Sequence, residues 1–222
     1  MIYEQLPNSN DVARRAAVLM ADRMWAAVAR RGSAALAVSG GRTPSEMFRV
    51  LAALPVPWAH VHLFQVDERS APDGHRDRNA TMLADDLLAL LPDTPAGVHL
   101  MDVSHPGSAT AADRYGNLLS RFAPDGLDLV HLGLGDDGHT ASWPPGDPVV
   151  DAAGPVAWSA EYQGRVRMTL TPMAVTSARE LLMTVVGPSK DAALAALTAG
   201  RPVIPAHRLD PSKLVLITDR PA

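Results

Sequence analysis

Apolar and polar positions alternate along this chain in two regular ways. Short, strongly apolar runs predict buried strands, and they cover residues 34–38, 61–66, 98–101, 127–134, 180–186 and 214–218. Longer stretches with apolar residues at helical spacing predict helices, and they cover residues 11–31, 43–54, 79–91, 108–122 and 189–198. Strands that alternate with helices are typical of a mostly parallel sheet. The sequence therefore predicts an α/β fold with a Rossmann-like sheet and helices on both faces.

Residue types at the expected helix ends support these boundaries. We expect Ser9 or Asn10 to cap the first helix and Asn79 to cap the third, because these side chains accept hydrogen bonds from free backbone N–H groups. Pro44 is expected at the favoured first position of the second helix. Ser189 is the expected cap of the last predicted helix.

The pattern changes after residue 144. Residues 144–156 are rich in proline and glycine, and two further strands are predicted at residues 149–157 and 165–170. No long linker or internal repeat divides the chain. We therefore expect residues 1–222 to form a single domain, with a small inserted lobe at about residues 145–170 as the alternative.

Composition limits the classes of function. The 222 residues are 47% hydrophobic, and their formal net charge of −4 does not favour general binding to nucleic acid. The absence of cysteine excludes disulfides, thiolate nucleophiles and cysteine-bound metals. No apolar run reaches transmembrane length, and residues 1–10 lack the apolar core of a signal peptide. We therefore expect a soluble cytoplasmic protein without a nucleic-acid or membrane partner.

The segment 133–142 is the most informative part of the chain. It follows the apolar run 127–134 and brings three glycines, two carboxylates and His139 to one turn. Ligands bind at the carboxyl ends of the strands in open α/β sheets, and histidine side chains titrate close to neutral pH. His139 is therefore the candidate for acid–base chemistry.

The segment from Ser39 to Pro44 has the order strand, glycine-rich turn, helix. Backbone N–H groups of Ser39, Gly40 and Gly41 and the positive end of the following helix would face the same point, and Arg42 and Thr43 would add side-chain donors. This arrangement suits a phosphate group. The segment lacks the spacing and the lysine of a P-loop, which disfavours a nucleoside triphosphate. An ordinary tight turn is the alternative.

Two other strand ends carry charges. A turn is predicted at Asp67, Glu68 and Arg69, which directly follow a strand and would lie at the rim of the sheet, with the start of a solvated loop as the alternative. Lys190 is one of only two lysines and falls in the first turn of a predicted helix, where a positive charge is unfavourable. We interpret Lys190 as a candidate anion ligand, with a solvated surface lysine as the alternative.

Other motifs carry less information. Gly133 to Gly138 fits the dinucleotide pattern G-x-G-x-x-G, but its two aspartates would repel a pyrophosphate. No G-x-S-x-G nucleophile elbow is present. His60 and His62 are expected to share a strand face but lack a nearby third ligand, so no metal site is predicted. His131 lies inside an apolar strand and is expected to be a core residue.

Taken together, five segments resemble the 6-phosphogluconolactonase family. They are residues 39–44, 67–69, 133–142, 167–171 and 187–190, in the order that the family has them. The resemblance implies the fold shared with glucosamine-6-phosphate deaminases and ribose-5-phosphate isomerases. It also implies hydrolysis of 6-phosphogluconolactone in the oxidative pentose phosphate pathway, without a metal or another cofactor.

Three departures from the family pattern are visible. Arg42 and Arg78 stand where serine is frequent, and Trp143-Pro144-Pro145 replaces the usual leucine-phenylalanine-proline. The related deaminases carry a glutamate a few residues after the histidine, whereas here no acidic residue follows before Asp147. This difference favours lactone hydrolysis over deamination.

The resemblance also suggests a role for each candidate residue. His139 would take a proton from water, and Asp67 or Asp137 would orient its ring. The groups that bind phosphate would come from the turns at residues 39–44 and 187–190, with two arginines nearby. These residues are Ser39, Gly40, Gly41, Arg42, Thr43, Lys190, Arg69 and Arg167. A sugar-phosphate isomerase or deaminase and a non-catalytic sugar-phosphate sensor are the alternatives. We expect a small-molecule substrate and a monomer or weak homodimer.

Overall fold

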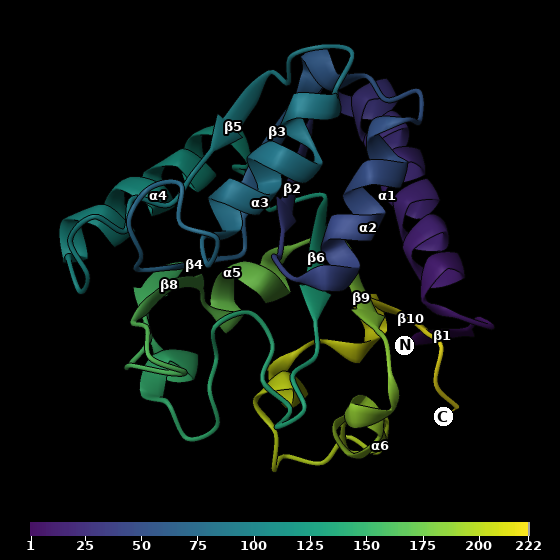
Figure 1. Ribbon diagram of the computed structural model, residues 1–222. Helices are drawn as coiled ribbons and strands as arrows, with labels where there is room; N and C mark the ends of the chain where they lie inside the picture. The colour runs from purple at the N-terminus through teal and green to yellow at the C-terminus, as the bar shows by residue number, and fades with distance from the viewer. Residues whose placement is uncertain (222) are drawn as a thin grey trace.

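The computed structural model describes residues 1–221 and contains a seven-stranded sheet in which all neighbouring strands are parallel (Figure 1). The strand order is β1-β10-β9-β6-β2-β3-β5. The bounds are β1 (Ile2–Gln5), β2 (Ala34–Val38), β3 (Val61–Gln65), β5 (Gly97–His99), β6 (Leu129–Gly133), β9 (Leu181–Val185) and β10 (Leu214–Thr218). The predicted α/β fold is confirmed.

Helices cover both faces of this sheet. The first face packs against α1 (Ser9–Arg31), α2 (Arg42–Ala52) and α3 (Asn79–Asp86), and the second against α4 (Ala109–Phe122), α5 (Pro172–Ser177) and α6 (Asp191–Thr198). Alternation within β2 explains the two layers, since successive strand side chains point to opposite faces. Leu36 and Val38 join the core of the first face, and Ala35 and Ala37 join that of the second.

A second, antiparallel sheet of three strands extends the molecule beside the main sheet. It consists of β4 (Asp67–Arg69), β8 (Arg167–Leu170) and β7 (Val156–Trp158), in that order. Val66 joins the two sheets, because its N–H donates to the Val38 carbonyl (3.0 Å) and its carbonyl accepts from Leu170 N–H (2.8 Å). The prediction that residues 67–69 form a turn is therefore wrong: a partner strand 100 residues away makes them a strand.

Residues 145–170 share the core of the main sheet. Val149, Val156 and Met168 are buried in the same cluster as Phe64 and Leu132. The segment contains a turn of 3-10 helix, η3 (Pro148–Asp151), and then β7, in place of the single strand predicted at residues 149–157. Pro148 and the Asp147 cap favour the helical turn. The single domain stays a prediction, and the shared core supports it.

Several helix ends differ from the predictions. Asn8 caps α1, because its side chain accepts from Asp11 N–H at 3.0 Å, so neither Ser9 nor Asn10 is the cap. Helix α2 begins at Arg42, which places Pro44 third, and Asn79 is the first residue of α3. Ser189 lies in a 3-10 turn before α6, where it caps nothing.

Short elements account for the rest of the chain. The sequence does not predict β1 and α5, of four and six residues, because so few positions show no clear period. The remaining 3-10 turns are η1 (Trp58–His60), η2 (Leu88–Leu90), η4 (Pro188–Lys190), η5 (Pro205–Arg208) and η6 (Pro211–Lys213).

The order of the strands creates a crevice in the middle of the sheet. From the centre, β2, β3 and β5 succeed one another toward one edge, while β6, β9 and β10 succeed one another toward the other. The connections therefore leave β2 and β6 in opposite directions. Such a switch point opens a space beyond the carboxyl ends of the two strands, where ligands bind in α/β sheets.

His131 of β6 lies in the interior, as predicted. Its side chain is fully buried, and Nε2 lies 3.0 Å from the Thr184 hydroxyl. Burial lowers the pKa of His131 to about 4 from the ordinary value of 6.5. The folded state therefore favours the neutral ring, whereas the unfolded state binds a proton more readily. As a result, the contribution of His131 to the free energy of unfolding is fully present above pH 6.5 and is lost as the pH falls toward 4.

We expect His131→Asn to make the free energy of unfolding less dependent on pH below pH 6.5. Relative to the variant, the wild type should lose roughly 3 kcal/mol of unfolding free energy between pH 6.5 and pH 4, because 1.36 kcal/mol corresponds to one pKa unit. Urea unfolding at a series of pH values measures the difference. His60→Asn, at an exposed position, is the control and should follow the wild type. Parallel profiles for H131N and wild type would contradict the prediction.

Candidate active site

A cavity of about 620 Å³ opens at the carboxyl ends of β2, β3, β6 and β9, where the crevice is expected. Ten of the eleven predicted site residues line it, and the eleventh, Asp137, contacts one of the ten. The ten are Ser39, Gly40, Gly41, Arg42, Thr43, Asp67, Arg69, His139, Arg167 and Lys190. Segments that are far apart in the sequence thus meet at one site.

The turn after β6 holds His139 in place. Gly135 N–H donates to the His139 carbonyl (2.7 Å), and the Thr140 hydroxyl donates to the Gly133 carbonyl (2.8 Å). The His139 ring lies against Gly135 so closely that a Cβ there would stand 2.0 Å from Nδ1. Glycine at residue 135 is therefore a condition for this ring position.

Asp137 contacts the imidazole directly. Its Oδ1 lies 2.6 Å from His139 Nδ1 and also accepts from His139 N–H at 3.2 Å. In the neutral ring this pairing assigns the proton to Nδ1, which donates to the carboxylate. Nε2 then keeps its lone pair, and this atom has no hydrogen-bond partner among residues 1–221. The arrangement leaves His139 able to accept a proton in the cavity.

Tyr162 completes this group of side chains. Its hydroxyl donates to Asp137 Oδ2 at 2.7 Å and lies 3.3 Å from His139 Nδ1. Partial burial raises the pKa of Asp137, but hydrogen bonds from Tyr162 and His139 outweigh burial and lower it to about 2. Burial and the bond to Asp137 raise the pKa of Tyr162 to about 12. At neutral pH the carboxylate is therefore ionised and the phenol protonated.

Asp67 also lines the cavity, but side chains other than His139 hold it. It is 6% exposed, accepts from the Ser142 hydroxyl (2.5 Å) and from Asn79 Nδ2 (3.2 Å), and makes no hydrogen bond to His139. Burial raises the pKa of Asp67, against the effect of Ser142 and two arginines. Of the two carboxylates considered from the sequence, Asp137 is the one in contact with the imidazole.

Arg69 and Arg167 form an unusual pair of like charges. They lie directly opposite each other on β4 and β8, and both line the cavity. Like charges in this position are unfavourable. Arg167 is 3% exposed, and the buried Nε atoms of both arginines have no partner among the described residues. Burial lowers the pKa of Arg167, while Asp67 opposes this change. The pair is suited to an anion, which would supply the missing acceptors.

The turn after β2 brings the start of α2 to the cavity. Gly41 has a φ of +124° and precedes the first residue of the helix. A Cβ on Gly40 would stand 2.1 Å from Asn79 Oδ1, so only glycine fits there. The Ser39 hydroxyl donates to the His131 carbonyl (2.9 Å) and ties the turn to β6. Ser39 therefore supports the turn through its hydroxyl.

Lys190 is paired within the protein. Its Nζ lies 2.5 Å from Asp136 Oδ1, and the Ser189 hydroxyl lies 3.2 Å from the same oxygen. Hydrogen bonding to Lys190 lowers the pKa of Asp136. Lys190 therefore meets a carboxylate of the turn that carries His139, and this pair stands at the edge of the same cavity.

Comparison with known proteins identifies the family. The sequence matches the family model for glucosamine-6-phosphate isomerases/6-phosphogluconolactonase over residues 7–218. The chain belongs to this family. A 6-phosphogluconolactonase of Synechocystis sp. is 33% identical over 200 residues, which cover 87% of this chain and 83% of the relative. The resemblance stated from the five sequence segments is thereby confirmed.

Solved structures of the family share the fold. A 6-phosphogluconolactonase from Shewanella baltica superimposes with a TM-score of 0.87 at 23% identity, covering 98% of this chain and 97% of that chain. A monomeric glucosamine-6-phosphate deaminase gives a TM-score of 0.85 at 18% identity, covering 99% and 98%. The fold is therefore common to proteins with both names, and only the site can distinguish them.

Two further structural findings concern partners. No helix within residues 1–221 is both long and apolar enough to cross a membrane. The same residues contain no group of three or more histidine, aspartate or glutamate side chains placed to hold a metal ion. His60 lies in η1, apart from the β3 face where His62 contacts His99 (3.1 Å), so the expected shared face is wrong.

The sequence alone does not predict a place at the site for Tyr162 or Ser142, nor the contacts of Asn79 with Asp67 and Gly40. Ser142 lies within the segment already singled out, and its contact with Asp67 depends on the packing of β4 against the turn. Tyr162 lies on a hairpin that nothing in the local sequence directs toward His139. Only the three-dimensional structure brings these residues to the site.

We expect Gly135→Ala to displace the His139 ring, because the added methyl group would overlap Nδ1. Overpacking of this kind costs about 1–3 kcal/mol of stability. Urea unfolding measures that cost, and ¹⁵N NMR of the imidazole measures the loss of the Asp137 contact. Gly133→Ala is the matched control in the same segment, since a Cβ there meets no atom within 4 Å. An unchanged imidazole spectrum in G135A would contradict the prediction.

Proposed function

We propose that this protein hydrolyses 6-phospho-D-glucono-1,5-lactone to 6-phosphogluconate, a step of the oxidative pentose phosphate pathway. The observation that carries the proposal is the Asp137–His139 pair, whose histidine lines a cavity that is also lined by several cationic side chains. The name of the Synechocystis relative supports the same reaction. The substrate carries a dianionic phosphate and a carbonyl that needs only water and a base.

His139 acts as the general base in this proposal. Nε2 takes a proton from water while the water oxygen forms a bond to the lactone carbonyl carbon. The tetrahedral intermediate then collapses, the bond from that carbon to the ring oxygen breaks, and the proton passes from Nε2 to the leaving oxygen. Asp137 keeps the ring oriented and stabilises the imidazolium, since its low pKa leaves it ionised throughout.

Cationic groups hold the substrate. In this proposal the phosphate is bound by Lys190 and by the N-terminal turn of α2, which includes Gly40, Gly41, Arg42 and Thr43. Arg69 and Arg167 bind further oxygens of the substrate, and Asp67 compensates part of their charge. Fixing the remote phosphate orients the carbonyl toward the water, an effect that can lower a barrier by roughly 7–11 kcal/mol.

The site supports a lactonase over a deaminase. The first acidic residue after His139 is Asp147, and its two carboxylate oxygens accept from the backbone N–H groups of Val149 (2.9 Å) and Ala160 (2.9 Å). It is 9% exposed and does not line the cavity. It is therefore a structural residue, unsuited to supply the acid for ring opening. The cytoplasmic location and the monomer or weak homodimer stay predictions.

We expect His139→Ala to lower kcat on the phosphorylated lactone by about 10²–10⁴-fold, the usual contribution of a general base, with little change in KM. The assay follows acid release from freshly made lactone after subtraction of spontaneous hydrolysis. His60→Ala is the control and should keep wild-type kinetics. Near-normal kcat in H139A would reject the role of the histidine. A wild type that binds the lactone without hydrolysing it would indicate a sensor, and turnover of glucosamine 6-phosphate would indicate a deaminase.

We expect Lys190→Ala to raise KM for the phosphorylated lactone by about tenfold or more, because a charge-assisted hydrogen bond to phosphate is lost. KM for unphosphorylated gluconolactone should change much less in the same variant. Lys190→Arg, which keeps the charge, should fall between K190A and wild type. Equal changes in KM for both lactones would show that Lys190 does not bind the phosphate.

A further inference from the structure

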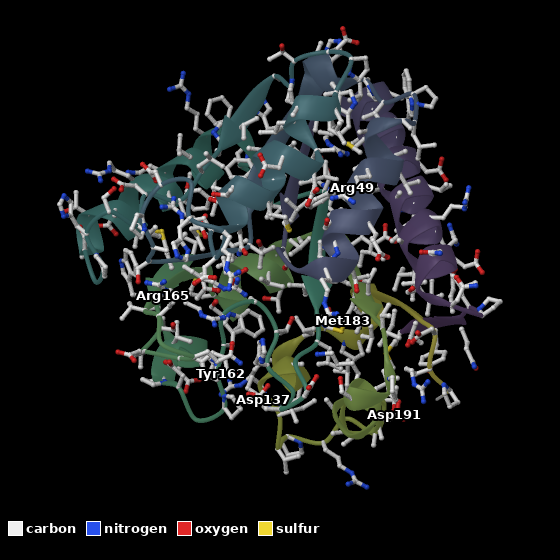
Figure 2. The ribbon with its side chains drawn as sticks, in the orientation of Figure 1. Arg49, Asp137, Tyr162, Arg165, Met183 and Asp191 are labelled. Carbon is white, nitrogen blue, oxygen red and sulfur yellow. The ribbon has the colours of Figure 1, made fainter. Side chains whose placement is uncertain are left out.

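Tyr162 is attached to the Asp137–His139 pair by three separate contacts. The hydroxyl bonds to Asp137 Oδ2 (2.7 Å) and approaches His139 Nδ1 (3.3 Å), and the ring meets the imidazole edge to face with centroids 5.4 Å apart. Figure 2 shows Tyr162 and Asp137 side by side, each from a different loop. The tyrosine does not line the cavity, so it does not belong to the substrate-binding surface.

The hairpin that carries Tyr162 is strained at one residue. Tyr162 N–H donates to the Arg165 carbonyl (2.9 Å) and Arg165 N–H to the Tyr162 carbonyl (3.2 Å). The two residues between them, Gln163 and Gly164, have φ values of +52° and +77°. Positive φ at both central positions defines a type I′ turn, which favours asparagine, aspartate or glycine at the first. Glutamine is an unfavourable choice there.

The side chain of Gln163, at this strained position, makes two hydrogen bonds to residues near His139 or in the cavity wall. Its Nε2 donates to the Tyr162 hydroxyl (3.1 Å), and its Oε1 accepts from Arg167 (3.0 Å). The Arg167 guanidinium also lies over the Tyr162 ring, 5.0 Å from its centroid. Gln163 thus holds the phenol hydroxyl from one side while Arg167 holds the ring. Strained residues persist where the surrounding contacts fix them, often at functional sites.

We propose that Tyr162, held by Gln163 and Arg167, is a positioning residue for the Asp137–His139 base. This inference rests on the proposed function, because it assigns a role within that reaction. The phenol hydrogen bond fixes the second carboxylate oxygen, so that the first can meet Nδ1 in only one orientation. The same bond withdraws negative charge from Asp137. The carboxylate therefore stabilises the protonated imidazole less strongly than it would without this bond.

The decisive variant is Tyr162→Phe, which keeps the ring and its contacts and removes only the hydroxyl. We expect kcat to fall about tenfold, as for loss of a hydrogen bond to a charged group, with KM within twofold of wild type. The acidic limb of the kcat/KM profile should move to higher pH, because the freed carboxylate stabilises the protonated base more strongly. A purely structural role for Tyr162 would leave this limb in place.

Tyr3→Phe is the matched control. It removes a tyrosine hydroxyl that bonds to the Arg220 carbonyl at the same distance of 2.7 Å, and Tyr3 lies in β1, outside the cavity. We expect Y3F to keep wild-type kcat and the wild-type pH profile. A loss in Y3F as large as in Y162F would show that any lost tyrosine hydrogen bond has this effect, and would overturn the inference.

Gln163→Asn separates positioning from stability. Asparagine suits the positive φ, so the melting temperature should stay level or rise, while its shorter side chain cannot span Tyr162 and Arg167. We expect kcat to fall in Q163N although the fold is not weakened. Wild-type kcat in both Y162F and Q163N would overturn the inference.

An imidazole ¹⁵N NMR titration keeps this test independent of the proposed reaction. In Y162F the His139 resonances should shift at neutral pH, whether or not the protein hydrolyses lactones. If the wild type hydrolyses the lactone while Y162F matches it in kinetics and spectrum, the inference fails and the proposed function stands. If the wild type has no lactonase activity but the resonances still shift, the proposed function fails and the contact with His139 stands.

Discussion

The side of the cavity that β4 and the start of α3 form depends on the buried carboxylate of Glu68. This side chain is fully buried and accepts hydrogen bonds from the backbone N–H groups of Arg69, Asn79 and Ala80 and from the side chain of Gln65, at 2.7–2.9 Å. An ion pair with Arg78 (3.1 Å) offsets its charge. A buried charge is tolerated only when it is satisfied in this way. Because two of these donors start α3, Glu68 fixes the helix against β4.

The effect of Glu68 extends to other residues that line the cavity. Fixing α3 places Asn79, whose amide donates to the Asp67 carbonyl (2.8 Å) and side chain (3.2 Å). Asn79 also lies against Gly40, so the turn before α2 has no room for a side chain at residue 40. Glu68, which from the sequence is only one of three charges at a strand end, therefore aligns Asp67, Arg69 and the glycine turn that we propose binds phosphate.

The sequence predicted the parts of the site that directly follow the ends of strands. Residues 34–38 and 214–218 are strands with the predicted bounds, and the turns that follow strands in the main sheet meet because parallel strands end at one edge. Contacts between side chains were beyond prediction. That Asp137 and not Asp67 touches His139 depends on the local turn, and that Tyr162 reaches them depends on a hairpin two elements away. Strand β4 was missed because its partner, β8, lies far along the chain.

The two adjacent aspartates of the turn after β6 contact different groups. Asp136 faces Lys190 and Ser189, and Asp137 faces His139 and Tyr162. Two identical, neighbouring side chains are thus not redundant: in the reaction that we propose, Asp136 acts on ligand affinity through Lys190, and Asp137 acts on the chemical step through His139. In any relative that keeps a single acid at this turn, the position of that acid, first or second, indicates which of the two tasks has been retained.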